Sequence, residues 1–197
     1  MPRRIAEERR AGILAAVAET LQAEGLPFPS YDRVAGHAAL SRQLVRHYFP
    51  DPEGLMVSAC QKVTASYLAE IARHLEAVDD EEGLTRLIDL CLDGAGARDE
   101  VPPPPAFESL IALARSSPAV RDALKAEVRA LRSLFSREVG RAHPQLAPEE
   151  REEVAHLLVA QLLGHWTMSD ALALRPGDPG SARAAMQGIV SAYTAQA

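Results

Sequence analysis

The stretch ALSRQLVRHYFPDPEGL, residues 39–55, decides how the rest of the chain is interpreted. With about 100° of rotation per residue, it predicts a short helix that has two different sides. One side carries long hydrogen-bond donors: Arg42, Gln43, Arg46 and His47. The other side is apolar: Leu44, Val45, Tyr48 and Phe49. The apolar side can pack on a core, and the polar side then faces solvent or a partner that accepts hydrogen bonds.

The residues in front of this helix predict a second short helix and a turn. Ser30 is a suitable N-cap for a helix over residues 31–38, and Ser41 is a suitable N-cap for the helix that follows the AALS turn. Two short helices joined by such a turn are typical of a helix-turn-helix, whose second helix enters the major groove of DNA. Arginine pairs with guanine and glutamine with adenine in that groove. From the spacing alone, a solvated polar face is an equally good explanation.

The remaining sequence predicts helices only. Aliphatic residues and alanine dominate, aromatic residues make up 5% of the chain, and β-branched runs are almost absent, so we expect an all-α fold. Asp51 is expected to cap a long connecting helix that starts at Pro52, where a missing N–H costs nothing. Besides the two short helices, the expected helices cover residues 4–24, 52–78, 81–96, 106–116, 118–142, 148–174 and 178–196.

Charge, cysteine usage and hydropathy restrict the class of protein. The net charge is −6, but residues 1–60 hold seven arginines and seven acidic residues, so the excess negative charge belongs to residues 61–197. Cys60 and Cys91 lie in apolar helical patterns and are expected to pack as reduced hydrophobes. The N-terminus lacks the apolar stretch of a signal peptide, and no run of 18 apolar residues occurs. We therefore expect a soluble, cytoplasmic protein.

Residues 5–57 resemble the DNA-binding domain of the TetR family of bacterial transcription regulators. Three pieces of sequence carry the resemblance: ILAAVAETLQAEG, SYDRVAGHAALS and RQLVRHYFPDPEGLM. The matching positions inside them are Val34-Ala35, Leu40-Ser41, Phe49 and Leu55. The resemblance implies an N-terminal three-helix helix-turn-helix domain over residues 1–50. It further implies a larger helical domain for effector binding and dimerisation over residues 51–197.

Three positions depart from the pattern of the family. Ala39 stands where the turn usually has glycine, which is tolerable if the residue is not left-handed. Pro52 replaces a lysine that often touches a phosphate, so that contact is lost. Arg46 replaces a tyrosine midway along the recognition helix, and the arginine either keeps a phosphate contact or adds a base contact.

Position by position, the resemblance implies a set of DNA-binding residues. Residues at the start of the second helix would lie near phosphates: Ser30, Tyr31 and Arg33. Residues of the recognition helix would face the groove: Ser41, Arg42, Gln43, Arg46 and His47. Tyr48 is ambiguous, because its ring belongs to the apolar side while its hydroxyl group is long enough to reach a phosphate. For each of them, helix capping or solvation is the alternative role.

The resemblance also implies partners. These are a second copy of the chain, a palindromic operator in double-stranded DNA, and a small-molecule effector that releases a repressor. The nearly all-apolar run VAHLLVAQLLGHW, residues 154–166, agrees with an interface between subunits, although a central core helix explains it as well. The candidate effector-binding residues are large side chains that also serve simply as core: Tyr67, Phe107, Phe135, His165, Trp166 and Met168. No cofactor or metal is expected.

Two other functions remain as alternatives. An enzyme is not expected, because the only Glu-x-x-His motif is Glu153–His156 and the sequence has no second copy, no His-Glu-x-x-His and no phosphate-binding loop. A helical dimer that acts only through protein partners would leave the polar side of the short helix unexplained. Finally, the DEVPPPP segment, Asp99–Pro105, is either a stiff connector or a lid over a cavity.

Overall fold

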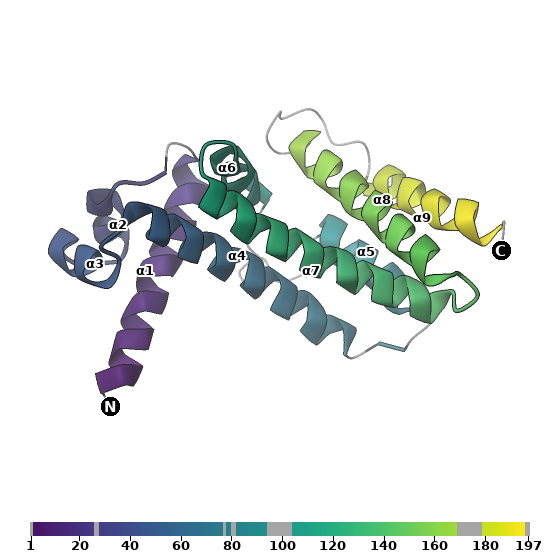
Figure 1. The fold of residues 1–197 in the computed structure, drawn as a ribbon, viewed down its shortest axis with the longest axis horizontal. Coiled ribbons are helices and arrows are strands. Elements are labelled where there is room, and N and C mark those ends of the chain that lie inside the picture. The colour runs from purple at the N-terminus through teal and green to yellow at the C-terminus, as the bar shows by residue number, and fades with distance from the viewer. Residues whose placement is uncertain are drawn as a thin grey trace. The chain divides into compact units, whose positions relative to one another are not determined.

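A computed structural model describes residues 2–25, 28–76, 78–79, 82–93, 104–168 and 179–195. The described residues contain helices and no strand, which confirms the expected all-α fold. In chain order the helices are α1 (Pro2–Glu24), α2 (Tyr31–His37), α3 (Arg42–Tyr48), α4 (Pro52–Leu75), α5 (Gly83–Asp93), α6 (Pro104–Ala114), α7 (Pro118–Ala142), α8 (Pro148–Trp166) and α9 (Pro179–Thr194), as Figure 1 shows.

The helix boundaries follow the sequence closely, with small differences. Helix α7 has the expected bounds, whereas α4 ends at Leu75, three residues early. Helix α6 begins at Pro104, two residues before the expected start, because prolines fit the first turn of a helix. The last two prolines of DEVPPPP therefore belong to α6, while residues 99–103 lie outside the described residues. Helix α8 ends at Trp166 and continues into a π-type turn at Thr167 and Met168, and the expected extension over 169–174 is likewise outside the described part.

The chain divides into two compact units. The first comprises residues 1–65 and 102–127, and the second comprises residues 66–101 and 128–197. Helices α4 and α7 therefore contribute residues to both units. The division is one of packing, and the functional domain boundary at residue 50 stays a prediction.

The first unit has a core built from apolar stripes of its helices. Helix α1 packs on α2 and α6, and α2 packs on α3. The fully or almost fully buried side chains include Ile13, Val17, Leu21, Val34, Val45, Phe49, Leu55 and Cys60. Asp51 caps α4 as expected, because its two carboxylate oxygens accept from the N–H groups of Glu53 at 3.1 Å and Gly54 at 2.8 Å. Ser117 caps α7 in the same unit and donates to a carboxylate oxygen of Glu53 at 2.6 Å.

The second unit packs α9 against α5 and α8. Its buried side chains include Leu87, Leu90, Cys91, Phe135, Val139, Leu158, Leu162 and Met186. Glu138 is a buried carboxylate with only 1% of its surface exposed. Arg137 Nε lies 2.9 Å and Arg141 Nη1 3.5 Å from one of its oxygens. Two cations therefore compensate the charge that burial would otherwise disfavour.

Both cysteines are free and buried, in agreement with the expected reduced hydrophobes. Burial raises the pKa of Cys60 to about 11, and Glu127 adds to this rise. Burial also raises the pKa of Cys91 to about 12. Both thiols therefore stay protonated at neutral pH. None of the described helices is long and apolar enough to span a membrane.

Candidate nucleic-acid interface

Helix α2 begins with a side-chain cap. Ser30 has an extended backbone, and its hydroxyl oxygen accepts from the N–H of Arg33 at 3.4 Å. The predicted cap is therefore present. The side chain of Arg33 is more than half exposed and forms an ion pair with Glu24 at the end of α1.

The turn between α2 and α3 has the hydrogen bonds of a Schellman motif. Leu40 N–H donates to Ala35 C=O at 2.9 Å, and Ala39 N–H donates to Gly36 C=O at 3.3 Å. Ala39 has a φ of +51°, so it occupies the left-handed position for which glycine is preferred. The condition under which alanine was expected to be tolerable is not met. The turn keeps its geometry at the cost of strain at Ala39.

Helix α3 has the two sides that the sequence predicts. Ser41 Oγ accepts from Leu44 N–H at 3.2 Å and caps the helix. Val45 and Phe49 are buried, and Leu44 and Tyr48 are half-buried. The exposed residues form a row on the opposite side: Arg42, Gln43, Arg46 and His47. The His47 ring meets the Tyr48 ring edge to face, with 5.3 Å between centroids.

The C-terminal end of α3 is held by side chains from α1 and α2. Arg10 donates from Nη1 to Tyr48 C=O at 2.7 Å, and its guanidinium carbon lies 4.3 Å from the centroid of the Phe49 ring. Tyr31 donates from its hydroxyl group to Phe49 C=O at 2.7 Å. Carbonyl groups at the end of a helix have no partner within the helix, so these two contacts satisfy them and fix the direction of α3.

Tyr31 therefore has a role that the sequence did not reveal. Partial burial raises the pKa of its hydroxyl group, Asp51 raises it further, and Arg46 acts in the opposite direction. The hydroxyl proton is directed at Phe49, and the expected phosphate contact of Tyr31 stays a prediction. Arg10 was also missed, although it lies three residues before Ile13 and seven before Val17, so the exposed arginine shares the side of α1 that carries the buried stripe.

Arg42 is paired within the helix-turn-helix. Its Nη1 lies 3.2 Å from Oδ2 of Asp32, which belongs to the first turn of α2. His37 Nδ1 lies 3.2 Å from Arg33 C=O and is thereby tied to its own helix. The two exposed arginines Arg33 and Arg42 thus each have an acidic neighbour, and neither acidic residue was expected to take part in the site.

Part of the expected effector site comes together in the second unit. The rings of Tyr67 and Trp166 meet edge to face at 5.9 Å, and Trp166 Nε1 donates to Cys91 C=O at 3.1 Å. Burial raises the pKa of Tyr67 well above its ordinary value, and the neighbouring Cys91 thiol raises it further. Tyr67, Cys91 and Trp166 therefore form one cluster.

The other expected effector residues are more dispersed. Phe135 is a fully buried core residue, and His165 is half-buried. Met168 is exposed, with 59% of its surface accessible. The side chain of Phe107 lies outside the described part of the structure.

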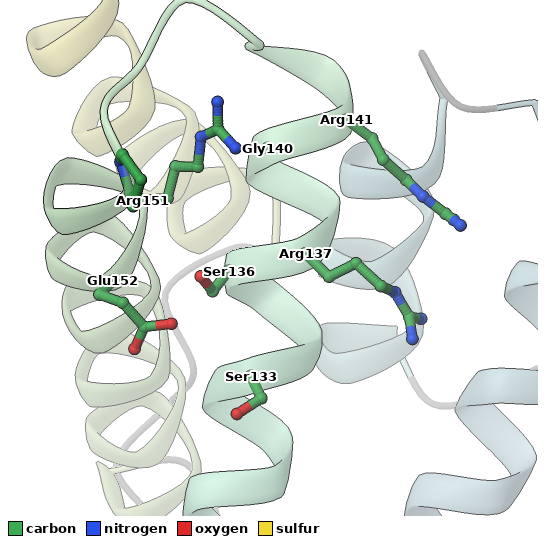
Figure 2. A pocket seen from close by; sticks show the side chains of 8 residues that line it. Ser133, Ser136, Arg137, Gly140, Arg141, Arg151 and Glu152 are labelled. Atoms are coloured by element: carbon green, nitrogen blue, oxygen red, sulfur yellow. The ribbon is translucent and has the colours of Figure 1, made fainter.

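A surface cavity of about 510 Å³ lies along α7 and α8. Figure 2 shows Ser133 and Ser136 of α7 on the side of that helix that faces Glu152 of α8, while Arg137 and Arg141 extend away from them. Arg151 donates from Nε to Leu146 C=O at 2.7 Å and from Nη2 to Pro144 C=O at 2.8 Å. Arg151 therefore pairs with backbone carbonyl groups, and Arg137 and Arg141 pair with Glu138. The contacts of these arginines are made to the protein, so the cavity has no evident charged site for a ligand. The described residues also contain no group of three or more potential metal ligands.

Helix α9 and the C-terminal half of α8 expose no charged side chain, whereas the N-terminal half of α8 exposes Glu149, Glu152 and Glu153. The exposed residues of α9 are small or polar: Ser181, Ala184, Ala185, Gln187, Gly188, Ser191 and Ala192. Arg183, the charged residue of this helix, pairs with Asp89 of α5. The C-terminal half of α8 exposes His156, Leu157 and Ala160, and Met168 follows it. The lack of charged side chains over these surfaces is one feature of the core of an interface between proteins.

The fold matches known structures along almost its whole length. A TetR transcription regulator from Haloarcula marismortui matches with a TM-score of 0.81 and 17% identity over 95% of this chain and 98% of that chain. A TetR-family transcriptional regulator from Rhodococcus sp. matches with a TM-score of 0.76 and 23% identity over 95% and 99% of the two chains. A transcriptional regulator from Saccharomonospora viridis, solved in complex with choline, matches with a TM-score of 0.77 and 17% identity over 94% and 96%.

These likenesses show that the chain has the fold of the TetR-type regulators: a helix-turn-helix followed by a larger helical part. Comparison of the sequence with models of protein families and with curated proteins found no match.

Proposed function

We propose that the protein is a sequence-specific DNA-binding transcriptional regulator in which α3 enters the major groove. The observation that carries the proposal is the exposed row Arg42, Gln43, Arg46 and His47 on a helix whose other side is buried. A helix that reads bases must present donors in a fixed orientation. The Ser41 cap at one end, and the contacts of Arg10 and Tyr31 at the other, support that requirement.

In this proposal the residues divide into readers and anchors. Arg42 and Gln43 begin α3, the part of a recognition helix that meets base edges, so they discriminate guanine and adenine respectively. Arg46 and His47 extend the same row. Ser30, Arg33 and Tyr48 lie beside phosphates, and Tyr31 acts mainly by holding α3. Contacts to phosphates position the protein without selecting a sequence.

We further propose that two copies associate through α8 and α9. The support is the uncharged exposed surface of α9 and of the C-terminal half of α8, which in α9 consists mainly of alanine, glycine and serine. A symmetric dimer presents two copies of α3 to half-sites that are about 34–36 Å apart, so the operator is a palindrome.

The regulator is proposed to be a repressor that a small molecule releases from DNA. The second unit would bind this effector near Tyr67 and Trp166, because this cluster places two aromatic rings next to each other and contains the buried hydroxyl group of Tyr67. The complex of the Saccharomonospora viridis protein with choline supports binding of a small molecule by a protein of this fold. Release requires that the effector bind more tightly to the form that does not bind DNA.

The proposal is tested by selecting bound sequences from a random pool of DNA duplexes with the purified protein at two salt concentrations. We expect an enriched palindrome that persists at the higher salt concentration. Binding without enrichment that disappears as salt increases would reflect attraction to phosphates only and would contradict the proposal. The variant Arg42→Ala/Gln43→Ala, passed through the same selection, is expected to lose the preference at specific positions of each half-site. If both proteins select the same motif, the assignment of α3 as the helix that contacts the bases is wrong.

A further inference from the structure

Asp32 and Arg42 connect the two helices of the helix-turn-helix through their side chains. Asp32 lies in the first turn of α2 and Arg42 is the first residue of α3. Arg42 Nη1 lies 3.2 Å from Asp32 Oδ2, and the two side chains are 57% and 63% exposed. The pair is therefore formed at the surface, next to the exposed row of α3.

The stability of the ion pair and attraction to DNA do not account for the contact between this carboxylate and Arg42, although an acidic residue in the first turn of α2 also interacts favourably with the helix dipole. Exposed ion pairs contribute little to folding, because water screens them and two long side chains must be ordered. A negative charge beside a DNA-binding surface also repels phosphates and weakens binding to every sequence. A function of Asp32 in DNA recognition therefore depends on its effect on Arg42.

The chemistry of the guanidinium group provides that function. Arginine has five N–H donors in a rigid plane, and pairing with guanine uses two of them toward O6 and N7. The contact with Asp32 occupies one nitrogen, Nη1, and leaves donors on Nε and Nη2 for a base. A side chain already held in one plane loses less conformational freedom when it binds.

We infer that Asp32 is a positioning residue that orients Arg42 for pairing with guanine and thereby sets the specificity of the protein. The inference rests on the proposed function. It adds that an acidic residue outside the recognition helix controls how strongly the correct base is preferred over a wrong one. Removal of the Asp32 carboxylate changes DNA affinity in opposite directions under the two explanations. If Asp32 acts only as a negative charge, its removal strengthens binding to all DNA. If Asp32 positions Arg42, its removal weakens binding to the correct sequence.

The test compares Asp32→Asn with the wild-type protein on two duplexes at one salt concentration. One duplex is the selected operator, and the other has the base read by Arg42 replaced, as identified from the positions at which Arg42→Ala loses preference. We expect the ratio of the two Kd values to fall roughly fivefold to tenfold in Asp32→Asn, which is part of the discrimination of a bidentate pair. Affinity for the replaced duplex is expected to stay equal or to increase.

Glu24→Gln is the matched control. Glu24 pairs with Arg33 as Asp32 pairs with Arg42, and its replacement removes one negative charge in the same way, but Arg33 lies on α2. The control is expected to leave the ratio of the two Kd values unchanged. Asp32→Glu, which keeps the charge, is expected to recover part of the ratio. Thermal unfolding of each variant establishes that the fold is intact, as expected for exposed residues.

The outcomes separate the inference from the proposed function. If Asp32→Asn binds both duplexes more tightly by the same factor, Asp32 acts as a simple charge and the inference is overturned while the proposed function stands. If Arg42→Ala alters no base preference although the wild type has a motif, Arg42 is not a reader and the inference is also overturned. A wild-type protein that selects no motif contradicts the proposed function itself. In a double variant with Arg42→Ala, the change Asp32→Asn should no longer affect the ratio.

Discussion

The hydroxyl group of Tyr31 donates to the backbone carbonyl of Phe49 over 2.7 Å, so the first residue of α2 is hydrogen-bonded to the C-cap residue of α3. Arg10 binds the adjacent carbonyl of Tyr48. The orientation of α3 thus depends on polar contacts at its C-terminal end as well as on the burial of Val45. Removal of one contact should alter the helix without unfolding the protein.

Tyr31→Phe removes that hydrogen bond and keeps the ring. We expect a loss of about 0.5–1.5 kcal/mol in the free energy of unfolding. We also expect weaker binding to all DNA sequences alike, because the change affects the placement of α3 and not its readers. Urea unfolding and binding to the selected operator and to a replaced duplex measure the two effects. A changed base preference with unchanged stability would contradict this interpretation.

Ala39→Gly should stabilise the protein, because Ala39 is left-handed with a φ of +51°. An alanine in this conformation costs about 1 kcal/mol relative to glycine, so we expect a gain of that size. Ala38→Gly is the matched control, since Ala38 has a right-handed φ of −76° and gains nothing from glycine. Thermal unfolding should show a higher Tm for the first variant and an equal or lower Tm for the second. A lower Tm for Ala39→Gly would mean that the turn is not strained.

Gly83→Ala should destabilise the protein. A Cβ atom at Gly83 would lie 2.5 Å from Oε2 of Glu138, and this carboxylate is buried and held by Arg137 and Arg141. Since the carboxylate cannot move without losing these partners, we expect a cost of about 1–3 kcal/mol. At Gly12, in the exposed middle of α1, a Cβ atom meets nothing within 4 Å. Gly12→Ala is therefore expected to stabilise by about 0.5–1 kcal/mol. Equal effects of the two changes in urea unfolding would contradict this packing.

Arg42→Ala and Gln43→Ala should each relax the preference at one position of the half-site. The loss of a bidentate contact reduces discrimination against the wrong base by about 1–3 kcal/mol. Arg33→Ala should instead weaken binding to all sequences and reduce its dependence on salt. Competition binding with single-base replacements measures the first effect and salt titration the second. If both α3 variants keep the base preference of the wild-type protein, Arg42 and Gln43 do not contact bases in the groove.

The stability of the protein should decrease in alkaline solution. The pKa values of Cys60 and Cys91 are raised by burial to about 11 and about 12, from an ordinary value of 9.0. Above the ordinary value the unfolded chain has released thiol protons that the folded chain retains, so the free energy of unfolding falls as pH rises. Urea unfolding from pH 7 to pH 10.5 should show the decrease, and Cys60→Ala/Cys91→Ala should reduce its slope. An identical slope for both proteins would exclude the thiols as its cause.

The parts of the fold that sequence predicted are those governed by local rules. Ser30, Ser41 and Asp51 cap their helices as expected because capping depends on residues two or three positions away. The buried stripe of α1 and the two sides of α3 follow from helical periodicity.

The contacts missed by the sequence join distant residues. Arg10 and Tyr48 are 38 positions apart, and nothing in the local pattern pairs them. No role was predicted for Asp32, and its pairing with Arg42 depends on how α2 and α3 pack. Ala39 was noted at a position where glycine is usual, but alanine is ordinarily right-handed, so its φ of +51° was not predicted. The cluster of Tyr67 and Trp166 was expected as two separate candidates, and its link through the Cys91 carbonyl depends on packing between helices.

The exposed row of α3 carries little of what keeps the helix in place. Burial of Val45 and Phe49, the Ser41 cap and the contacts of Arg10 and Tyr31 all lie outside the four exposed positions. The scaffold should therefore accept many amino acids at residues 42, 43, 46 and 47 with little loss of folding. New target sequences then become accessible by mutation of these four positions together with Asp32, which makes this helix a convenient starting point for divergence and for engineering altered recognition.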